Sequence, residues 1–229
     1  MLNEKWLNLA CGDNKLEHRD SVTQEANGYY FGIDIKKTEN TDSVMDLEVF
    51  PWDIESESAE EIICSHYVEH TPYETYSKRI INAINDSNDY DQLKSRIAQI
   101  DLNAPSDGLI LFMNEVYRIL KSEVVDTNGE THGGRIRIIA PYYSSIRCWQ
   151  DPTHRRAISE VTFLYFNKGW RDANKLSHYG ITANFDFLSG YDMQQDFASK
   201  HEEARNFSVL HYINVVNDIH VTMTKIKPE

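Results

Sequence analysis

WLNLACGDNK, residues 6–15, and YYFGIDI, residues 29–35, form the most informative part of the chain. The first segment predicts a short buried strand followed by a tight loop at Gly12, and the second predicts a strand that ends at Asp34. This order places backbone N–H groups at the end of one strand and a carboxylate at the end of the next. A nucleoside can lie across such a sheet edge with its hydroxyl groups on the carboxylate. The two segments therefore indicate a site for an adenosine-type ligand.

Each residue of this pair has a simpler structural explanation when it is taken alone. Gly12 is a single glycine rather than the G-x-G-x-x-G of a dinucleotide site, so an ordinary turn is the simpler interpretation. Asp34 is a residue type that also begins helices. Together, at the ends of successive apolar strands, the two residues favour ligand binding. Asp46 and Leu47 follow a further short apolar segment, where they could contact an adenine ring or form a turn.

Apolar segments of strand length alternate with longer segments of helical periodicity, which is typical of an α/β fold. No linker divides them, so we expect a single domain over residues 1–229. Residues 86–108 are rich in Asp, Asn and Ser and indicate an insertion with a short helix at 91–100. The expected strands are residues 6–10, 29–34, 43–47, 61–65 and 135–141, followed by an antiparallel pair at 183–191 and 218–226. The expected helices are residues 73–85 and 109–121, with a further helical segment at 159–167.

The composition is that of an acidic globular protein. The 229 residues are 41% hydrophobic and 11% aromatic, and the formal net charge is −13. That charge disfavours non-specific binding to nucleic acid or to an anionic membrane. A local basic cluster could still bind a nucleic acid, or it could be a solvated face. The cluster comprises Arg147, Arg155, Arg156, Lys168 and Arg171.

The cysteines and the apolar segments indicate a reducing, cytoplasmic location. The three cysteines are Cys11, Cys64 and Cys148, and no C-x-x-C pair is present, so neither a zinc knuckle nor a disulfide framework is indicated. The N-terminal residues lack the apolar core of a signal peptide. No apolar segment approaches the roughly 20 residues that span a bilayer, so no membrane partner is expected.

The segment CSHYVEH, residues 64–70, admits two interpretations. His66, Glu69 and His70 spell H-x-x-E-H, the order found on a helix of inverted zinc proteases. However, the segment follows a predicted strand directly, and Pro72 would interrupt a helix two residues later. We therefore interpret the segment as a strand-end loop that lines the ligand site, and we expect no bound metal ion.

The segment APYYSSIRCWQDPTHRR, residues 140–156, contains several groups suited to a substrate pocket. A histidine can act as a general base at neutral pH, so His154 is a candidate base, with Asp151 to orient it. Tyr143 is a third candidate catalytic residue. Alternatively, Asp151 begins a turn with Pro152, and His154 packs in a structural loop.

In their order along the chain, these segments resemble the motifs of class I S-adenosylmethionine-dependent methyltransferases. NLACG is similar to the first motif of that family, GIDI to the acidic second motif, and Asp46-Leu47 to the third, which contacts adenine. CSHYVEH resembles the loop after the fourth strand, and GGRIRIIAP resembles the fifth strand. DPTH followed by an aromatic-containing helix recurs in small bacterial and phage-like members. The resemblance extends over nearly the whole chain.

The resemblance implies a Rossmann-like α/β fold with a central seven-stranded, mostly parallel sheet and an antiparallel C-terminal strand. It also implies S-adenosylmethionine as the cofactor, bound across the carboxyl ends of the first four strands. The cofactor-binding residues implied are Ala10, Cys11, Gly12, Asp34, Ile35, Asp46, Leu47, Ser65 and His66.

Two features depart from the family pattern. Asn8 stands where the family usually has an acidic residue, and the short polar segment between the first two strands predicts a reduced or missing crossover helix. We expect methyl transfer to an O or N acceptor held by residues 141–180, with a small-molecule or sugar-like acceptor favoured. The alternatives are a nucleic-acid or nucleotide methyltransferase that uses the basic cluster, and a catalytically inactive binding protein of the same fold.

Overall fold

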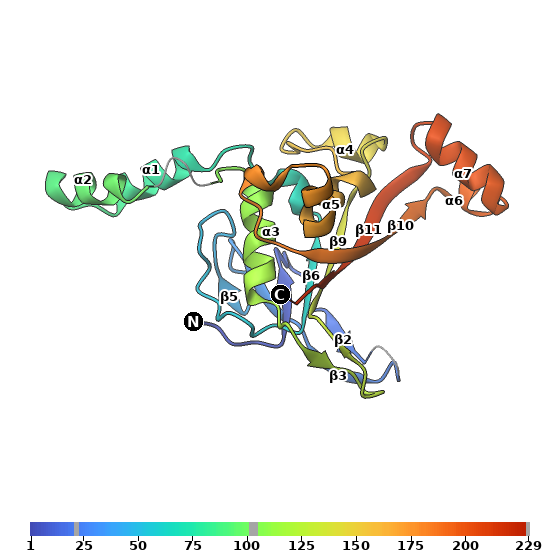
Figure 1. Ribbon diagram of the computed structural model, residues 1–229, viewed down its shortest axis with the longest axis horizontal. Helices are drawn as coiled ribbons and strands as arrows, with labels where there is room; N and C mark the ends of the chain where they lie inside the picture. The colour runs from blue at the N-terminus through green and yellow to red at the C-terminus, as the bar shows by residue number, and fades with distance from the viewer. Residues whose placement is uncertain (21–22, 101–104, 228–229) are drawn as a thin grey trace.

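A single seven-stranded sheet forms the centre of the computed structural model, which describes residues 1–20, 23–100 and 105–227 (Figure 1). Its strands are β1 (Trp6–Leu9), β4 (Phe31–Asp34), β5 (Ser43–Val44), β6 (Glu61–Ser65), β9 (Arg135–Pro141), β10 (Phe185–Met193) and β11 (Val216–Lys225). They lie in the order β10-β11-β9-β6-β1-β4-β5. Six strands point the same way, and β11 runs antiparallel to both of its neighbours. The expected sheet with an antiparallel C-terminal strand is confirmed.

Helix α3 (Gly108–Ile119) packs its apolar side against one face of the sheet. Its N-terminus is fixed by Asp107, whose carboxylate accepts hydrogen bonds from the backbone N–H groups of the first turn. Phe112 and Val116 are fully buried, as are Ile62 and Ile136 of the sheet. Because α3 begins beside the carboxyl ends of the parallel strands, its first turn lies at the same edge as the loops that follow those strands.

The other face of the sheet is polar around β6 and β9. Arg137 points away from the core with its side chain 51% exposed and forms an ion pair with Glu61 at 2.5 Å. The Tyr30 hydroxyl donates to Glu61 at 2.7 Å and accepts from Arg137 at 2.7 Å. This face is therefore stabilised by partly exposed polar contacts instead of deep apolar packing.

A hairpin takes the place of the first crossover helix. Strands β2 (Glu17–Arg19) and β3 (Ala26–Tyr29) pair antiparallel between β1 and β4, and the described part of this connection contains no helix. The hairpin is anchored where the His18 ring stacks on Trp6, with ring centroids 3.9 Å apart. The prediction of a reduced or missing crossover helix is confirmed.

Most of the expected elements are present, with changes at their ends. Strands β6 and β9 have the predicted bounds, whereas the segment predicted as one strand at 29–34 is divided at Tyr30 between β3 and β4. The strand expected at 43–47 shortens to β5, because the chain turns at Asp46. The helical segment at 159–167 is the 3-10 helix η2 (Glu160–Phe166).

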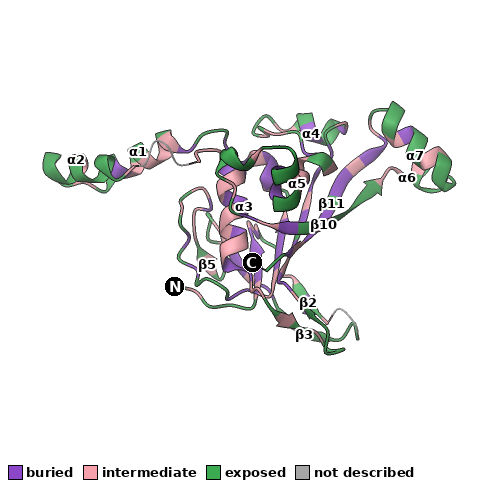
Figure 2. Ribbon diagram, viewed as in Figure 1, coloured by how far each residue is buried: buried purple, intermediate pink, exposed green. Residues whose placement is uncertain are grey.

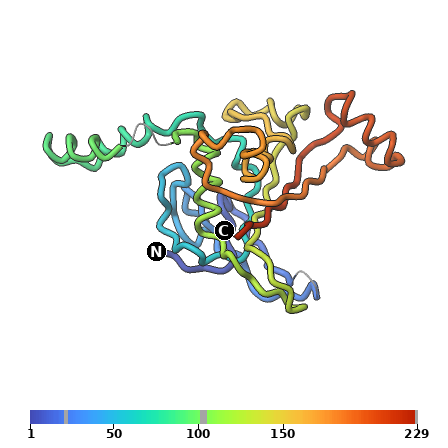
Figure 3. The backbone as a smooth tube through the Cα atoms, in the orientation of Figure 1, coloured from blue at the N-terminus to red at the C-terminus, as the bar shows by residue number. Residues whose placement is uncertain are grey.

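Two helical arms leave the core at opposite ends of its longest axis (Figure 3). One contains α1 (Tyr76–Asn85) and α2 (Tyr90–Ala98), and the other contains α6 (Gln195–Ala198) and α7 (Glu202–His211). Figure 2 shows that the arms are largely exposed while the purple, buried residues gather in the sheet and α3. The expected insertion at 86–108 corresponds to the outer part of the first arm, and its residues 101–104 lie outside the described residues.

The remaining described elements are short and lie in loops. They are η1 (Val68–His70), β7 (Val124–Val125), β8 (Thr131–His132), α4 (Ile146–Gln150), α5 (Lys168–Ala173) and η3 (Ser177–Tyr179). Within the described residues, no helix combines the length and the apolar character needed to cross a membrane. All three cysteines are buried free thiols.

Candidate functional site

Three residues at the carboxyl ends of the strands adopt left-handed backbone conformations. Ala10 follows β1 with a φ of 55°, Gly12 has a φ of 56°, and His66 follows β6 with a φ of 55°. Such angles are uncommon outside glycine, and they concentrate at functional sites where the surrounding structure maintains them. A Cβ atom added to Gly12 would meet nothing within 4 Å, so this turn borders open space. A ligand can therefore approach the backbone closely at the end of β1.

The Asp34 carboxylate lies beside this turn. Its Oδ2 accepts a hydrogen bond from the Gly12 N–H at 2.9 Å, and its Oδ1 accepts one from the Lys36 N–H at 2.9 Å. A carboxylate offers about four acceptor positions, so each oxygen retains capacity for a ligand hydroxyl. Ile35 follows with 64% of its surface exposed. The end of β4 thus presents hydrogen-bond acceptors next to an uncovered apolar side chain.

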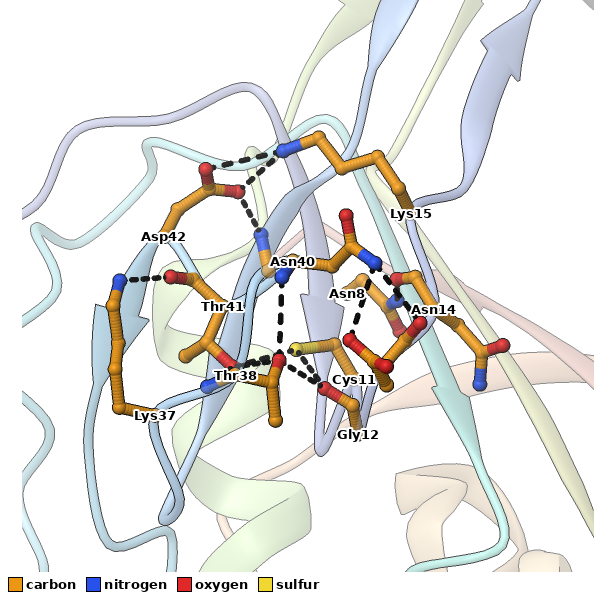
Figure 4. A network of polar contacts seen from close by, with 12 residues as sticks. Asn8, Cys11, Gly12, Asn14, Lys15, Lys37, Thr38, Asn40, Thr41 and Asp42 are labelled. Carbon is orange, nitrogen blue, oxygen red and sulfur yellow. Dashed lines mark hydrogen bonds and ion pairs between the residues drawn. The ribbon is translucent and has the colours of Figure 1, made fainter.

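A network of polar contacts holds the loop after β1 against the loop after β4 (Figure 4). The Thr38 hydroxyl donates to the Gly12 carbonyl at 3.0 Å, and Asn40 Nδ2 donates to the Asp13 carbonyl at 3.0 Å. Asn8 is 3% exposed, and its side-chain amide donates to a backbone carbonyl within the same loop at 3.3 Å. Asn8 therefore serves here to fix the loop, and the turn at Gly12 is held in shape without a ligand.

Asp42 extends this network to the body of the sheet. Its carboxylate accepts a hydrogen bond from the Gly32 N–H at 2.7 Å and forms an ion pair with Lys15 at 2.8 Å. Burial alone would raise the pKa of the Asp42 carboxyl, but the hydrogen bonds from Lys15 and Gly32 outweigh burial and lower the pKa. The Cys11 side chain is 2% exposed and packs beneath the loop, where burial raises the pKa of its thiol.

Asp46 and Leu47 occupy different environments. Asp46 forms an ion pair with Lys78 of α1 at 2.6 Å, and its other carboxylate oxygen accepts from the Glu48 N–H at 3.0 Å. Leu47 is 4% exposed, and its carbonyl accepts from the Trp52 indole at 3.2 Å. Leu47 is therefore a core residue, and its side chain is not free to lie against a ring; Asp46 remains at the rim of the site.

A second cluster of polar side chains follows Ser65 at the end of β6. Glu69 is completely buried, and neither of its carboxylate oxygens has a hydrogen-bond partner among the described residues. His66 Nδ1 lies 3.4 Å from Glu69 Oε1, and this interaction raises the pKa of the His66 imidazole against the opposing effect of burial. Burial and the nearby Glu69 charge raise the pKa of the Cys64 and Cys148 thiols. The two thiols near the Glu69 carboxylate are thus held in their neutral form, whereas the same carboxylate favours the protonated form of His66.

The loop after α4 brings His154 to this cluster. The rings of His70 and His154 meet edge to face, with centroids 4.7 Å apart. One ligand atom from each of Glu69, His70 and His154 lies within 4.8 Å of the others. The H-x-x-E-H segment forms only the single turn η1 and not a helix, so its two histidines do not share a helical face as in inverted zinc proteases.

The three candidate catalytic residues are arranged differently from the expectation. His154 Nδ1 hydrogen-bonds the Cys148 carbonyl at 3.0 Å, so that carbonyl, and not Asp151, orients the ring. Asp151 Oδ2 lies 3.9 Å from the other ring nitrogen, Nε2. Tyr143 is 45% exposed and meets Tyr142 edge to face at 4.7 Å. None of these contacts brings the Tyr143 hydroxyl to His154.

The predicted basic cluster does not form one free surface, because several of its members are buried or paired with acidic residues. Arg171 is 4% exposed and donates to three backbone carbonyls at 2.7 to 3.3 Å, so its role is structural. Arg156 pairs with Asp107 at 2.8 Å, and Arg147 pairs with Asp218 at 2.5 Å. Sequence alone could not reveal this, because the acidic partners lie far from the arginines in the chain. The other members are Arg155, which is exposed, and Lys168, which pairs with Asp172.

An apolar cavity of about 370 Å³ opens beside the first turn of α3. Its lining includes Arg156, Val161, Tyr165, Phe166 and Tyr179 from the segment expected to hold the acceptor. Arg156 also joins this cavity to the second cluster, because its backbone N–H donates to the Glu69 carbonyl at 3.1 Å.

The sequence interpretation did not anticipate that Glu69 and His70 would meet His154 in one cluster. Both belong to a motif that contains the residue types of a metal site, which was a usable signal. The partner that completes their cluster, His154, lies in a distant loop, and no spacing rule connects the two segments.

No protein-family model and no curated protein sequence matches the chain. Among solved structures, the chain is similar to a SAM-dependent methyltransferase from Archaeoglobus fulgidus, with a TM-score of 0.53 at 13% identity over 97% of this chain and 86% of the other. The fold is that of class I methyltransferases.

Two further solved structures give weaker likenesses. An S-adenosylmethionine-dependent methyltransferase from Mesorhizobium loti has a TM-score of 0.42 at 12% identity, covering 97% of this chain and 91% of the other. The YcgJ protein of Bacillus subtilis has a TM-score of 0.44 at 13% identity, covering 99% and 93%.

Proposed function

We propose that this protein transfers a methyl group from S-adenosylmethionine to an O or N acceptor. The observation that carries the proposal is the edge formed by Gly12 and Asp34, where a turn open to solvent adjoins a carboxylate with unused acceptor positions. This edge lies at the carboxyl ends of β1 and β4, where open α/β sheets bind their ligands.

The residues present fit the cofactor. Asp34 would accept from the ribose hydroxyls, the exposed Ile35 would pack against the adenine ring, and the open space at Gly12 would admit the chain that bears the sulfonium. The cofactor supplies an electrophilic methyl group on a positively charged sulfur. The acidic side chains of Asp13 and Asp46 near the same edge favour a cationic ligand.

The acceptor would occupy the cavity beside α3 and the cluster around His154. The lining is largely apolar, and its two charged residues, Arg156 and Asp107, pair with each other, which favours a small organic acceptor over a polyanion. The protein's main contribution would be alignment of the acceptor with the methyl group, which can be worth about 7–11 kcal/mol of the barrier. The finer assignment of a small-molecule or sugar-like acceptor rests on this cavity and on the net charge of −13.

His154 is the candidate general base of the metal-free protein. Its Nδ1 is committed to the Cys148 carbonyl, so Nε2 is free to accept a proton from the acceptor. The exposed Tyr143 is a second candidate. Replacement His154→Ala should lower turnover without weakening cofactor binding, whereas full turnover in this variant would remove His154 from the mechanism; Tyr143→Phe tests the second candidate in the same way.

A nucleic-acid or nucleotide acceptor is the second candidate. The exposed Arg155 favours it, because this side chain lies one residue from His154. Phosphate contacts make binding strongly dependent on salt. A steep fall of turnover with added salt would support this acceptor class, and an unchanged rate would support the small molecule.

The proposal is tested first by thermal unfolding with and without S-adenosylhomocysteine. At about one hundred times its dissociation constant, a ligand stabilises a protein by roughly 2.7 kcal/mol. For a domain of this size the melting temperature should rise by about 5–11 °C. Transfer of a labelled methyl group to a panel of acceptors then tests the reaction. Absence of any shift at saturating ligand would contradict the proposal, and tight binding without transfer would favour the inactive binding protein.

A further inference from the structure

The Glu69 carboxylate is a buried charge with an incomplete environment. Its side chain is 1% exposed, and neither oxygen has a hydrogen-bond partner among the described residues. His66 Nδ1 lies 3.4 Å from Oε1, but this contact does not have the geometry of a hydrogen bond. An unpaired buried carboxylate is costly, so a native structure that keeps one usually supplies a partner.

The hydrogen bonds of His70 define which of its nitrogens is free. The Thr153 hydroxyl donates its single proton to the Asp151 carboxylate at 2.7 Å, because a carboxylate at neutral pH can only accept. The contact between Thr153 Oγ1 and His70 Nδ1, at 3.1 Å, must then be donated by the imidazole. His70 Nδ1 therefore carries the proton, and in the neutral ring Nε2 bears a lone pair.

The same argument applies to His154. A backbone carbonyl can only accept, so the 3.0 Å contact with Cys148 places a proton on His154 Nδ1 and leaves the lone pair on Nε2. Both imidazoles thus use Nδ1 to donate to a neighbouring oxygen. Metal-ligating histidines show this arrangement, because the second hydrogen bond fixes the tautomer and the ring orientation.

We propose that Glu69, His70 and His154 bind a divalent transition-metal ion. Three ligand atoms, one from each residue, already lie within 4.8 Å of one another, and two imidazoles with a carboxylate are a ligand set of known metal sites. A cation held by these three residues would give the Glu69 carboxylate the partner that it lacks among the described residues. Side-chain rotations that shorten these separations to about 3.4 Å would complete a tetrahedral arrangement at ligand distances of about 2.0–2.1 Å.

The donor set indicates the kind of ion. Nitrogen and carboxylate oxygen without thiolate suit Zn²⁺, Co²⁺ or Mn²⁺, in contrast to Mg²⁺ or Ca²⁺, which prefer oxygen alone. The nearby Asp151, with its side chain 43% exposed, and His66, 47% exposed, line the solvent side of the cluster. The open side of the ion would therefore face solvent and the acceptor region.

This site is independent of the cofactor, so metal binding can be measured in its absence. It also excludes the role of His154 as a general base, because one nitrogen cannot bind an ion and accept a proton at the same time. The proposal replaces the expectation from sequence that the chain binds no metal ion.

The test begins with full-length protein treated with a chelator and then dialysed. Isothermal titration with ZnCl₂, repeated with CoCl₂ and MnCl₂, should give one saturable site per chain, and thermal unfolding should shift upward by about 5–11 °C at one hundred times the dissociation constant. Bound Co²⁺ should show visible absorption of a nitrogen- and oxygen-ligated ion. Absence of a saturable site for all three ions would overturn the proposal.

Variants then test the assignment of the ligands. Glu69→Gln, His70→Ala and His154→Ala should each abolish the metal-dependent thermal shift, whereas His211→Ala, an exposed residue on α7, should keep it. Glu69→Gln removes a buried unpaired charge, so in the absence of metal its melting temperature should equal or exceed that of the wild type. A wild-type response in Glu69→Gln and His154→Ala would show that the ion binds elsewhere and would overturn the assignment.

Discussion

Replacement of Asp34 by Asn tests the cofactor edge most directly. The Asp34 carboxylate accepts one backbone N–H on each oxygen, both at 2.9 Å, and Asn keeps only one of the two acceptors. Loss of one bond to a partly exposed charged group should cost about 1–2 kcal/mol of folding free energy, or about 2–8 °C in melting temperature. The same loss removes one charge-assisted bond to the ribose, worth about 1.5–3 kcal/mol, so the dissociation constant for S-adenosylhomocysteine should rise about 10- to 150-fold.

Isothermal titration below the melting temperature of both proteins measures this change, and Asp42→Asn is the matched control. Asp42 also accepts a backbone N–H, from Gly32 of β4 at 2.7 Å, and pairs with Lys15 of the loop after β1, but it does not adjoin the open turn at Gly12. Asp42→Asn should lose a similar stability and keep its affinity. Wild-type affinity in Asp34→Asn, or an equal loss in both variants, would refute the assignment of the carboxylate to the ribose.

Three further predictions concern stability. Gly32→Ala should cost about 1–3 kcal/mol in denaturant unfolding, because its Cβ would lie 2.6 Å from the Asn40 carbonyl oxygen. A neutral result would mean that the loop after β4 can move away from that strand at no cost. The pKa of the Asp42 carboxyl is lower in the folded protein than in the unfolded chain, where it is about 3.9, so the ionised carboxylate stabilises the fold above that pH. This contribution disappears as the pH falls through the folded pKa, and the difference in unfolding free energy between wild type and Asp42→Asn should therefore narrow between about pH 5 and pH 3. A constant difference would contradict this. Phe112→Ala should cost about 3–5 kcal/mol at a fully buried site, whereas Tyr90→Ala, 75% exposed on the arm, should change stability by less than about 0.5 kcal/mol.

The sequence predicts the parallel core of this fold well, for a physical reason. Strand β6 is largely apolar and β9 begins with alternating arginine and isoleucine, and burial of the apolar residues against α3 is strong enough that pattern and structure coincide. The hairpin of β2 and β3 has no such pattern, because its residues are polar or exposed. Its anchor is the stacking of His18 on Trp6, a contact between segments that no local periodicity records.

The candidate site likewise has one part that the sequence predicts and one part that it does not. Gly12 and Asp34 follow neighbouring parallel strands, so their meeting is a consequence of the topology and is visible in the sequence. The cluster around Glu69 depends on a loop after α4 that folds back to the end of β6. The tautomers of His70 and His154 are set by the Thr153 hydroxyl and the Cys148 carbonyl, and the sequence carries no sign of these contacts.

The two faces of the sheet tolerate different amino-acid substitutions during evolution. Ile62 and Ile138 on the side of α3 must keep their volume, because they are fully packed in the core. Glu61 and Arg137 on the other side need only remain complementary, since their partly exposed pair tolerates exchange of sign or neutral replacement. Sequences that evolve from this one can therefore reverse the charge on the face of Glu61 and Arg137 and so attract different molecules to it. The packed face against α3 would continue to hold the strand ends in register.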